Sequence, residues 1–265
     1  MSAFAPGEFF QITAAGRRLR AQWIGGPAAP GARCLVFLHE GLGSIPQWED
    51  FPAALCRATG LSGLLYERWG FGGSEALALP RPRDHLEREA EDALPEVLAA
   101  CGVRRPVLIG HSDGGTIALL YAAACPERAE ACVTLAAHVF VEDVTRGGIE
   151  AVVARWRAGG LRDRLARHHG ANTEAMFRGW AETWLDPAAR DWNVEHRLSA
   201  ITCPALVIQG ADDAHGTPAQ VAAIAGGVSG PAETWMIPDC GHNPHLERPD
   251  LVCARIAGFI KNLWQ

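Results

Sequence analysis

Short runs of apolar residues recur along the chain, with amphipathic stretches between them. Residues 34–38 are wholly apolar and lie between Gly31 and Gly41, a pattern typical of a strand buried on both faces of a sheet. Similar runs occupy residues 61–66, 106–109, 131–135, 205–209 and 233–237. Helical periodicity occupies residues 48–58, 86–101 (where Pro95 predicts a kink or an early turn), 116–124, 218–224 and 250–263. Because buried strands alternate with helices, the sequence predicts an α/β fold with a doubly wound, mostly parallel sheet.

Two segments depart from this alternation. Residues 9–24 alternate between apolar and polar positions and carry three arginines, which predicts an antiparallel hairpin at the sheet edge. Residues 141–199 contain no buried-strand run; they are helical in period, rich in Arg and Trp, and interrupted by two Gly-Gly pairs and an Asp-Pro pair. We therefore expect a helical cap at 141–199, inserted into a core formed by residues 1–140 and 200–265.

Composition narrows the class of protein. A chain of 265 residues is long enough for one catalytic domain with an inserted lobe. A net charge of -6 without a basic stripe argues against a nucleic-acid partner. The first eight residues lack an export signal and no long apolar span follows, so we expect a cytoplasmic protein without a membrane partner. Eight scattered cysteines without a C-x-x-C pair predict reduced thiols. The oligomeric state stays open.

The strongest chemical signal lies between the apolar run at 106–109 and the helical stretch at 116–124. The sequence there is Gly110-His111-Ser112-Asp113-Gly114-Gly115, a G-x-S-x-G pattern between a strand and a helix. A serine on such a sharp turn has a strained backbone, and small residues two places on either side let the turn close. An ordinary helix N-cap is the alternative reading of Ser112. The strand before it, the helix after it and the third glycine favour a nucleophile.

A serine hydroxyl needs a base to take its proton and an acid to orient that base. With this type of turn, the acid and then the histidine follow the serine along the chain. Asp212 and Asp213 follow the run at 205–209, at a strand's carboxyl end, where open α/β sheets keep their active sites. His242 lies on the loop after the run at 233–237, and we predict that it is the base. The pattern alone does not choose between the two aspartates.

Ten histidines offer alternatives to this base. His245 is the nearest rival, because it lies three residues later on the same loop. Surface positions are expected for His85, His168, His169 and His196. A metal site built from Asp239, His242 and His245 is conceivable, but Pro244 prevents the helix that would align these ligands. We expect neither a metal nor a cofactor.

Two further motifs precede the turn. They read Leu38-His39-Glu40-Gly41-Leu42-Gly43-Ser44 and Arg68-Trp69-Gly70-Phe71-Gly72-Gly73-Ser74. The first is similar to the H-G-x-x-G-S oxyanion loop of the α/β-hydrolase superfamily, and the second to its D-x-R-G-x-G-x-S turn. Together with the G-x-S-x-G turn and the loops after the last two strands, these motifs make the sequence resemble that superfamily over nearly its whole length. In that family the acid is the third residue after the glycine that ends the strand, which implies Asp213.

The resemblance also implies an oxyanion hole made by two backbone amides. They belong to Asp113, directly after the nucleophile, and to Gly41 in preference to Leu42. Glu40 stands where the family usually has glycine, and Asp113 where methionine, leucine or glutamine is common. We expect both carboxylates to point away from the oxyanion and to bind a cationic or hydroxyl group of the substrate. For Glu40, a structural hydrogen bond is an equal alternative.

Aromatic residues are concentrated in the expected cap, which favours an apolar or aromatic acyl group. They are Trp156, Phe177, Trp180, Trp184 and Trp192. Trp180 and Trp184 are four residues apart on one helical face, so packing is the alternative role for this pair. We therefore favour Trp48 and His138 as substrate contacts before the cap tryptophans. The full candidate set for substrate binding is Glu40, Leu42, Trp48, His138 and Trp180.

Together these residues predict a serine hydrolase that cleaves a small carboxylic ester through an acyl-enzyme, with Ser112, His242 and Asp213 as nucleophile, base and orienting acid. The same triad would serve a lactone, a thioester or a carbon–carbon bond, as in the similar meta-cleavage-product hydrolases. Cofactor-independent dioxygenases share the fold and are a further alternative. A haloalkane dehalogenase would need aspartate at position 112. A binding protein or hormone receptor that lost turnover usually lacks a triad member, whereas here all three are present.

Overall fold

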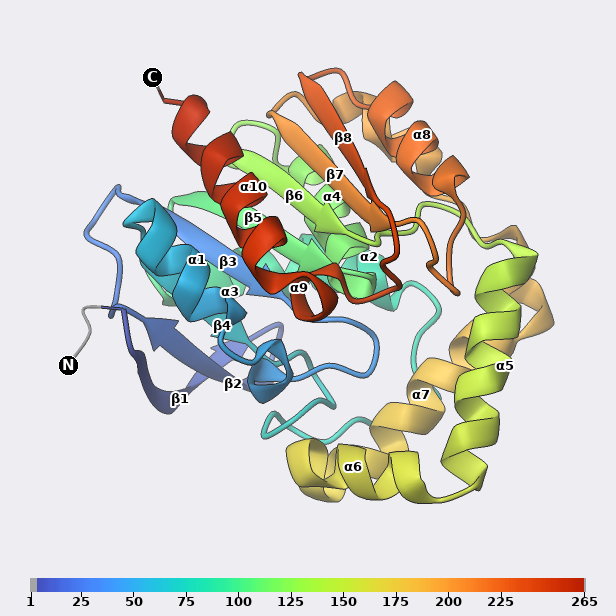
Figure 1. Ribbon diagram of the computed structural model, residues 1–265. Helices are drawn as coiled ribbons and strands as arrows, with labels where there is room; N and C mark the ends of the chain where they lie inside the picture. Colours follow the sequence, from blue (N-terminus) through green and yellow to red (C-terminus); the bar gives the residue numbers. More distant parts are fainter. Residues whose placement is uncertain (1–3, 265) are drawn as a thin grey trace.

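The computed structural model describes residues 4–264. Residues 1–3 and residue 265 lie outside it. Residues 1–3 belong to the N-terminal stretch in which we expect no export signal. Its strands form one eight-stranded sheet in the order β1-β2-β4-β3-β5-β6-β7-β8 (Figure 1). Their bounds are β1 Pro6–Ala14, β2 Arg17–Ile24, β3 Arg33–Leu38, β4 Gly63–Tyr66, β5 Arg105–His111, β6 Ala131–Leu135, β7 Ala205–Gly210 and β8 Ala232–Ile237. The six strands from β4 to β8 in this order pair in parallel, whereas β1 and β2 form the antiparallel hairpin at the edge. The predicted doubly wound, mostly parallel sheet is confirmed.

The central strands are apolar throughout because each of their faces is covered. Along β3, Leu35 and Phe37 belong to one hydrophobic cluster, and Val36 and Leu38 to another on the opposite face. Helices α1 (Phe51–Thr59) and α10 (Pro249–Asn262) pack together over the first face, in front of the sheet in Figure 1. The other face is covered by α4 (Asp113–Ala124), α3 (Leu94–Ala100) and α8 (Pro218–Gly227).

The helical stretch before β5 is interrupted where the sequence places Pro95. It consists of α2 (His85–Arg88), a π turn η2 (Glu89–Ala93) and α3. Proline cannot donate a backbone hydrogen bond, and its ring crowds the carbonyl four residues earlier, here Glu91 inside the π turn. The irregularity expected near Pro95 is thus a widened helical turn.

The chain between β6 and β7 forms helices and no strand, apart from an isolated β-bridge between Phe140 and Asn193. The longer ones are α5 (Asp143–Arg157), α6 (Gly160–His169) and α7 (Thr173–Leu185), which pack on one another and project beyond the sheet (Figure 1). Short turns η3 (Gly170–Asn172), η4 (Pro187–Asp191) and η5 (Glu195–Ala200) complete the segment, and η5 packs on α4 and α8. The remaining short helices are η1 (Ile45–Trp48) and α9 (Pro244–Glu247). Within residues 4–264, no helix is long and apolar enough to cross a membrane.

Candidate active site

Ser112 occupies the sharp turn between β5 and α4. Its backbone lies in the left-handed region, with φ 51° and ψ -117°, which is a strained conformation for a residue with a side chain. A Cβ on Gly114 would overlap the carbonyl oxygen of Leu38, and one on Gly110 would overlap the backbone of Gly114. Both glycines of the G-x-S-x-G pattern are therefore required for the turn to pack against the loop that follows β3.

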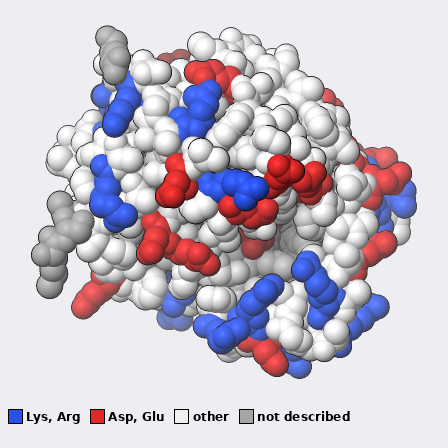
Figure 2. All heavy atoms as spheres, in the orientation of Figure 1, with Lys and Arg blue, Asp and Glu red and all other residues white. Residues whose placement is uncertain are grey.

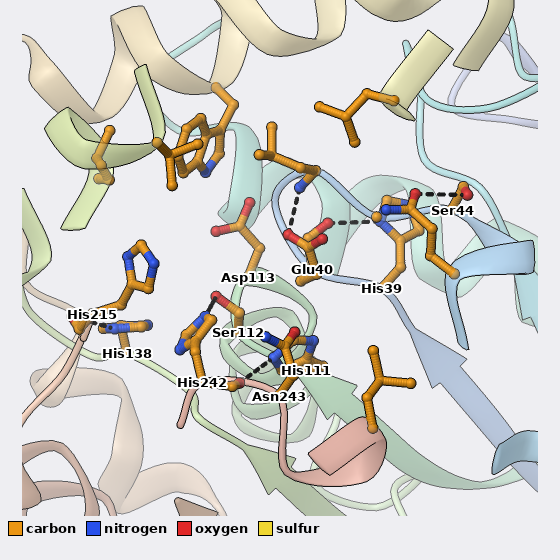
Figure 3. Close-up of a pocket in the computed structure, with 18 of the residues that line it drawn as sticks. His39, Glu40, Ser44, His111, Ser112, Asp113, His138, His215, His242 and Asn243 are labelled. Carbon is orange, nitrogen blue, oxygen red and sulfur yellow. Dashed lines mark hydrogen bonds between the residues drawn. The ribbon is translucent and has the colours of Figure 1, made fainter. Parts of the chain in front are cut away.

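Three strand ends bring the side chains of Ser112, Asp213 and His242 together. Figure 3 shows the ring of His242 hydrogen-bonded to Ser112. Nε2 of His242 lies 3.0 Å from Oγ of Ser112, and its Nδ1 lies 2.8 and 2.9 Å from the two carboxylate oxygens of Asp213. This arrangement lets Nδ1–H donate to Asp213 while Nε2 accepts the serine proton. Burial opposes ionisation of Asp213, but the hydrogen bond and charge of His242 lower the pKa of this carboxyl below its usual value.

Three residues that the sequence did not indicate hold this trio in place. The backbone N–H of His215 donates to Oδ1 of Asp213 at 2.8 Å. Nε2–H of His111 donates to the carbonyl oxygen of His242 at 2.7 Å. Glu247 accepts the N–H groups on either side of His242, those of residues 241 and 243. The histidine loop is thereby fixed by contacts on its carbonyl side and on both flanks.

The two rivals in the sequence lie elsewhere. Asp212 is exposed, whereas the side chain of its neighbour Asp213 is buried. His245 is buried and packs against the rings of Trp48, Phe51 and His111. Burial and the neighbouring His242 lower the pKa of His245 to about 3, so that its ring is a weak base.

His169 is buried, which corrects the expectation of a surface position. Of the other three histidines expected at the surface, His196 is exposed, and His85 and His168 are half-buried. Nδ1 of His169 accepts the N–H of Gly72 at 2.9 Å, and its Nε2–H donates to the carbonyl of Leu42 at 3.0 Å. These bonds connect the end of α6 to both glycine-rich loops of the core. They also require a neutral ring, because a second proton on Nδ1 would face the Gly72 N–H.

This contact predicts a loss of stability in mild acid. Burial lowers the pKa of His169 to about 4, whereas an unfolded histidine titrates near 6.5. As the pH falls, His169 therefore becomes protonated in the unfolded chain before it does so in the folded one. The free energy of unfolding, which is highest above pH 6.5, decreases as the pH drops toward 4. We expect His169→Gln to remove about 2 kcal/mol of the difference in unfolding free energy between pH 7 and pH 5. Urea unfolding at both pH values measures it, with the exposed His196→Gln as control; an unchanged difference in His169→Gln would contradict the contact.

The two amides expected at an oxyanion site are those of Gly41 and Asp113. Within residues 4–264, neither amide donates a hydrogen bond to the protein. The amide of Leu42 is occupied, because it donates to Oε2 of Glu40 at 2.6 Å. The Glu40 side chain therefore makes the structural hydrogen bond that was the alternative to substrate binding. Its burial raises the pKa of this carboxyl.

A cavity of about 560 Å³ lies above Ser112, and all five candidate substrate-binding residues line it. Figure 3 shows two of them, Glu40 and His138, beside Ser112. Apolar side chains of α5 and α6 form one wall: Ile149, Val152, Leu161 and Leu165. Trp180 and Trp184, for which packing was the alternative, both line the cavity. Trp156 and Phe177 instead stack on each other, with ring centroids 3.8 Å apart. Figure 2 shows the hollow at the surface, with positively charged side chains beside it.

Polar groups of the cavity gather around His242. His138 lies with its ring centroid 5.9 Å from that of His242, and its Nε2–H donates to the carbonyl of His215 at 2.9 Å. The His215 ring lies closer, at 4.5 Å. Burial lowers the pKa of both flanking histidines, that of His215 to about 3. No group of three or more potential metal ligands occurs in the described part of the chain.

Comparison with known proteins identifies the family. The model of the alpha/beta hydrolase family matches residues 35–255. The chain belongs to the alpha/beta hydrolase family. It is 29% identical over 189 residues to the serine hydrolase BPHL of Homo sapiens, covering 68% of this chain and 63% of that protein, so the match spans less than two thirds of the human relative.

Two further comparisons cover more of the alpha/beta hydrolase chain. The 2-succinyl-6-hydroxy-2,4-cyclohexadiene-1-carboxylate synthase of Enterobacter sp. (strain 638) is 27% identical over 250 residues, 88% of this chain and 93% of its own. The crystal structure of a membrane phospholipase A superposes with a TM-score of 0.77 at 20% identity, covering 97% of this chain and 87% of that one. At this identity the structural likeness shows the fold alone.

Proposed function

We propose that the chain is a serine hydrolase that cleaves a small carboxylic ester. Ser112 is the nucleophile, His242 the general base and acid, and Asp213 the residue that orients the histidine. The hydrogen-bonded series from Asp213 through His242 to Ser112, on a strained turn below a cavity, is the observation that supports this function. The human relative is named a serine hydrolase, in agreement with the proposal.

The proposed reaction proceeds in two halves. Oγ of Ser112 attacks the ester carbonyl carbon while Nε2 of His242 takes the hydroxyl proton, and the carbonyl oxygen becomes an oxyanion held by the N–H groups of Gly41 and Asp113. The histidine then gives its proton to the leaving alcohol, and an acyl-enzyme forms. Water attacks the acyl group, His242 takes a proton from that water, and returning it to Ser112 releases the acid.

We assign residues 141–199 as a cap that closes over the core formed by residues 1–140 and 200–265. The apolar side chains of α5 and α6 and the tryptophans of α7 then form the acyl pocket, which favours an apolar acyl group. Trp48 and His138 complete the pocket near Ser112. A lactone, a thioester or a carbon–carbon bond is the alternative substrate class, because the same triad and amides serve each.

A fluorophosphonate probe tests the proposal directly. We expect one covalent adduct on the wild-type chain, seen by intact protein mass, and none on Ser112→Ala, since only an activated serine attacks this phosphorus centre. A parallel panel of p-nitrophenyl esters, lactones and acyl thioesters then ranks the substrate classes by kcat/KM. A wild-type chain without adduct, or an equal adduct on Ser112→Ala, would rule out the serine-hydrolase function.

A further inference from the structure

Arg68 is buried behind the loop that follows β3. It lies directly after the acid Glu67, on the loop that follows β4, and only 3% of its surface is exposed. Its backbone N–H donates to Nε2 of His39 at 3.1 Å. Its Nη2 donates to the carbonyl oxygens of His39 at 3.3 Å and of Glu40 at 2.8 Å. Arg68 therefore holds the residues that immediately precede Gly41.

The shortest of these bonds acts on the peptide group that contains the Gly41 amide. The carbonyl of Glu40 and the N–H of Gly41 belong to one planar trans peptide and point in opposite directions. This carbonyl also accepts Nδ1–H of His39 at 2.8 Å and the N–H of Gly43 at 3.0 Å. Three donors thus fix the orientation of the Gly41 N–H. A hydrogen bond from a cation to the carbonyl also polarises the peptide and strengthens its N–H as a donor.

The same guanidinium faces the other amide of the site. Nη1 and Nη2 of Arg68 each lie 3.5 Å from Oδ2 of Asp113, whose backbone N–H is the second proposed oxyanion donor. These distances are long for an ion pair, so the pair alone does not account for the placement of Arg68. Its Nε is buried without a hydrogen-bond partner in the described chain, which is a cost of placing the residue there.

The acidic groups near the nucleophile are a second reason for a cation at this place. Glu40 and Asp113 both line the cavity beside Ser112, and an ionised carboxylate at either position would oppose the negative charge of a tetrahedral intermediate (Figure 3). Arg68 pairs with the Asp113 carboxylate, and it contacts Glu40 at the backbone carbonyl. Because the three groups are largely shielded from water, their mutual electrostatic effects are weakly screened.

Arg68 is not required for the usual role of its loop. In the D-x-R-G-x-G-x-S turn the acid stands three residues before the first glycine, which is the place of Glu67 before Gly70. Glu67 is fully buried and accepts hydrogen bonds from Arg20, from the N–H of Ile45 and from the N–H of Gly73. Glu67 thereby organises the turn, and Arg68 occupies its variable second position.

We propose that Arg68 is a positioning residue for the oxyanion hole: it fixes and polarises the Gly41 amide and offsets the Asp113 carboxylate. The proposal rests on the serine-hydrolase function. The N–H groups that Arg68 supports act on the full negative charge of the tetrahedral intermediate and only weakly on the neutral carbonyl of the substrate. Loss of Arg68 is therefore expected to lower kcat rather than to raise KM.

The test compares Arg68→Met and Arg68→Lys with the wild-type chain, using a p-nitrophenyl ester and a trifluoromethyl ketone. The ketone forms a hemiketal oxyanion on the serine, so a change in its affinity reports oxyanion stabilisation without turnover. For Arg68→Met we expect kcat per fluorophosphonate-titrated site to fall about 10- to 100-fold, while KM stays within about threefold of the wild-type value. This fall in kcat is somewhat smaller than the one caused by loss of a direct oxyanion donor. The affinity for the ketone should fall by the same factor as kcat. Arg68→Lys, which retains the charge, should lose less of both.

Arg81→Met is the matched control. Arg81 is also a buried arginine that stacks on the Phe71 ring, as Arg68 does, but among the described residues it makes no ion pair with Asp113, and its Nε and Nη2 have no hydrogen-bond partner. We expect Arg81→Met to keep the wild-type ketone affinity per titrated site. Unchanged ketone affinity in Arg68→Met, or a loss confined to KM, would overturn the proposal; if that variant does not fold, the same outcome in Arg68→Gln, which also lacks the charge, would do so. A wild-type chain that forms no fluorophosphonate adduct would instead refute the underlying function.

Discussion

Alanine at position 112 or 242 is expected to lower turnover of an activated ester by on the order of 10⁴-fold or more. Ser112→Ala removes the atom that forms the acyl-enzyme, and His242→Ala removes the acceptor that lies 3.0 Å from that atom. Turnover of the double variant should be little lower than that of either single variant, because the nucleophile and the base act as a unit and neither catalyses the reaction without the other. Steady-state kinetics with a p-nitrophenyl ester measures all three variants.

Two histidine variants control for general effects of the substitution. His196 is exposed and does not line the cavity, so His196→Ala should retain wild-type turnover. His245→Ala removes a ring that packs on Trp48 and Phe51, so its main effect should be on stability. If His245→Ala lost turnover as proposed for His242→Ala while His242→Ala stayed active, the base would have been assigned to the wrong histidine.

The parallel sheet could be predicted because its signal is local. A strand such as β3 is apolar at every position, since Leu35 and Val36 face different clusters and both are buried. The turn at Ser112 was equally accessible, because its glycines, its strand and its helix are adjacent in sequence. By contrast, the choice of Asp213 over Asp212 came from family resemblance, because two neighbouring carboxylates look alike until a loop 29 residues away approaches one of them.

The burial of His169 was missed although the sequence carried a signal for it. Leu161, Leu165 and His169 are spaced by four residues and therefore lie on one face of α6. The face that carries the cavity-lining leucines thus also carries the histidine that binds the core loops. The hydrogen bond from Arg68 to the Glu40 carbonyl had no such signal. It joins loops 28 residues apart; Glu40 stands where the family usually has glycine, and Arg68 occupies a variable position of its motif.

Two adjacent Asp→Asn substitutions give the sharpest test of the triad. Both remove one negative charge and change the side-chain shape very little, so any difference between them reports position. Asp213→Asn offers an N–H to Nδ1 of His242, which favours the tautomer with its proton on Nε2, facing Ser112. That tautomer cannot accept the serine proton. We expect kcat/KM to fall by about 10⁴-fold, the effect known when a serine protease loses its orienting acid in this way.

Asp212→Asn should change kcat/KM less than about twofold, because exposed side chains away from the reacting atoms contribute little to the transition state. Ester kinetics at pH 7.5, with each variant's unfolding midpoint in urea, separates a catalytic loss from a folding loss. Asp213 also accepts the N–H of His215, so Asp213→Asn is expected to lower the midpoint slightly. A loss in Asp212→Asn with an active Asp213→Asn would place the acid one residue earlier. It would also require a loop register different from the one in which both carboxylate oxygens of Asp213 lie within 2.9 Å of the histidine.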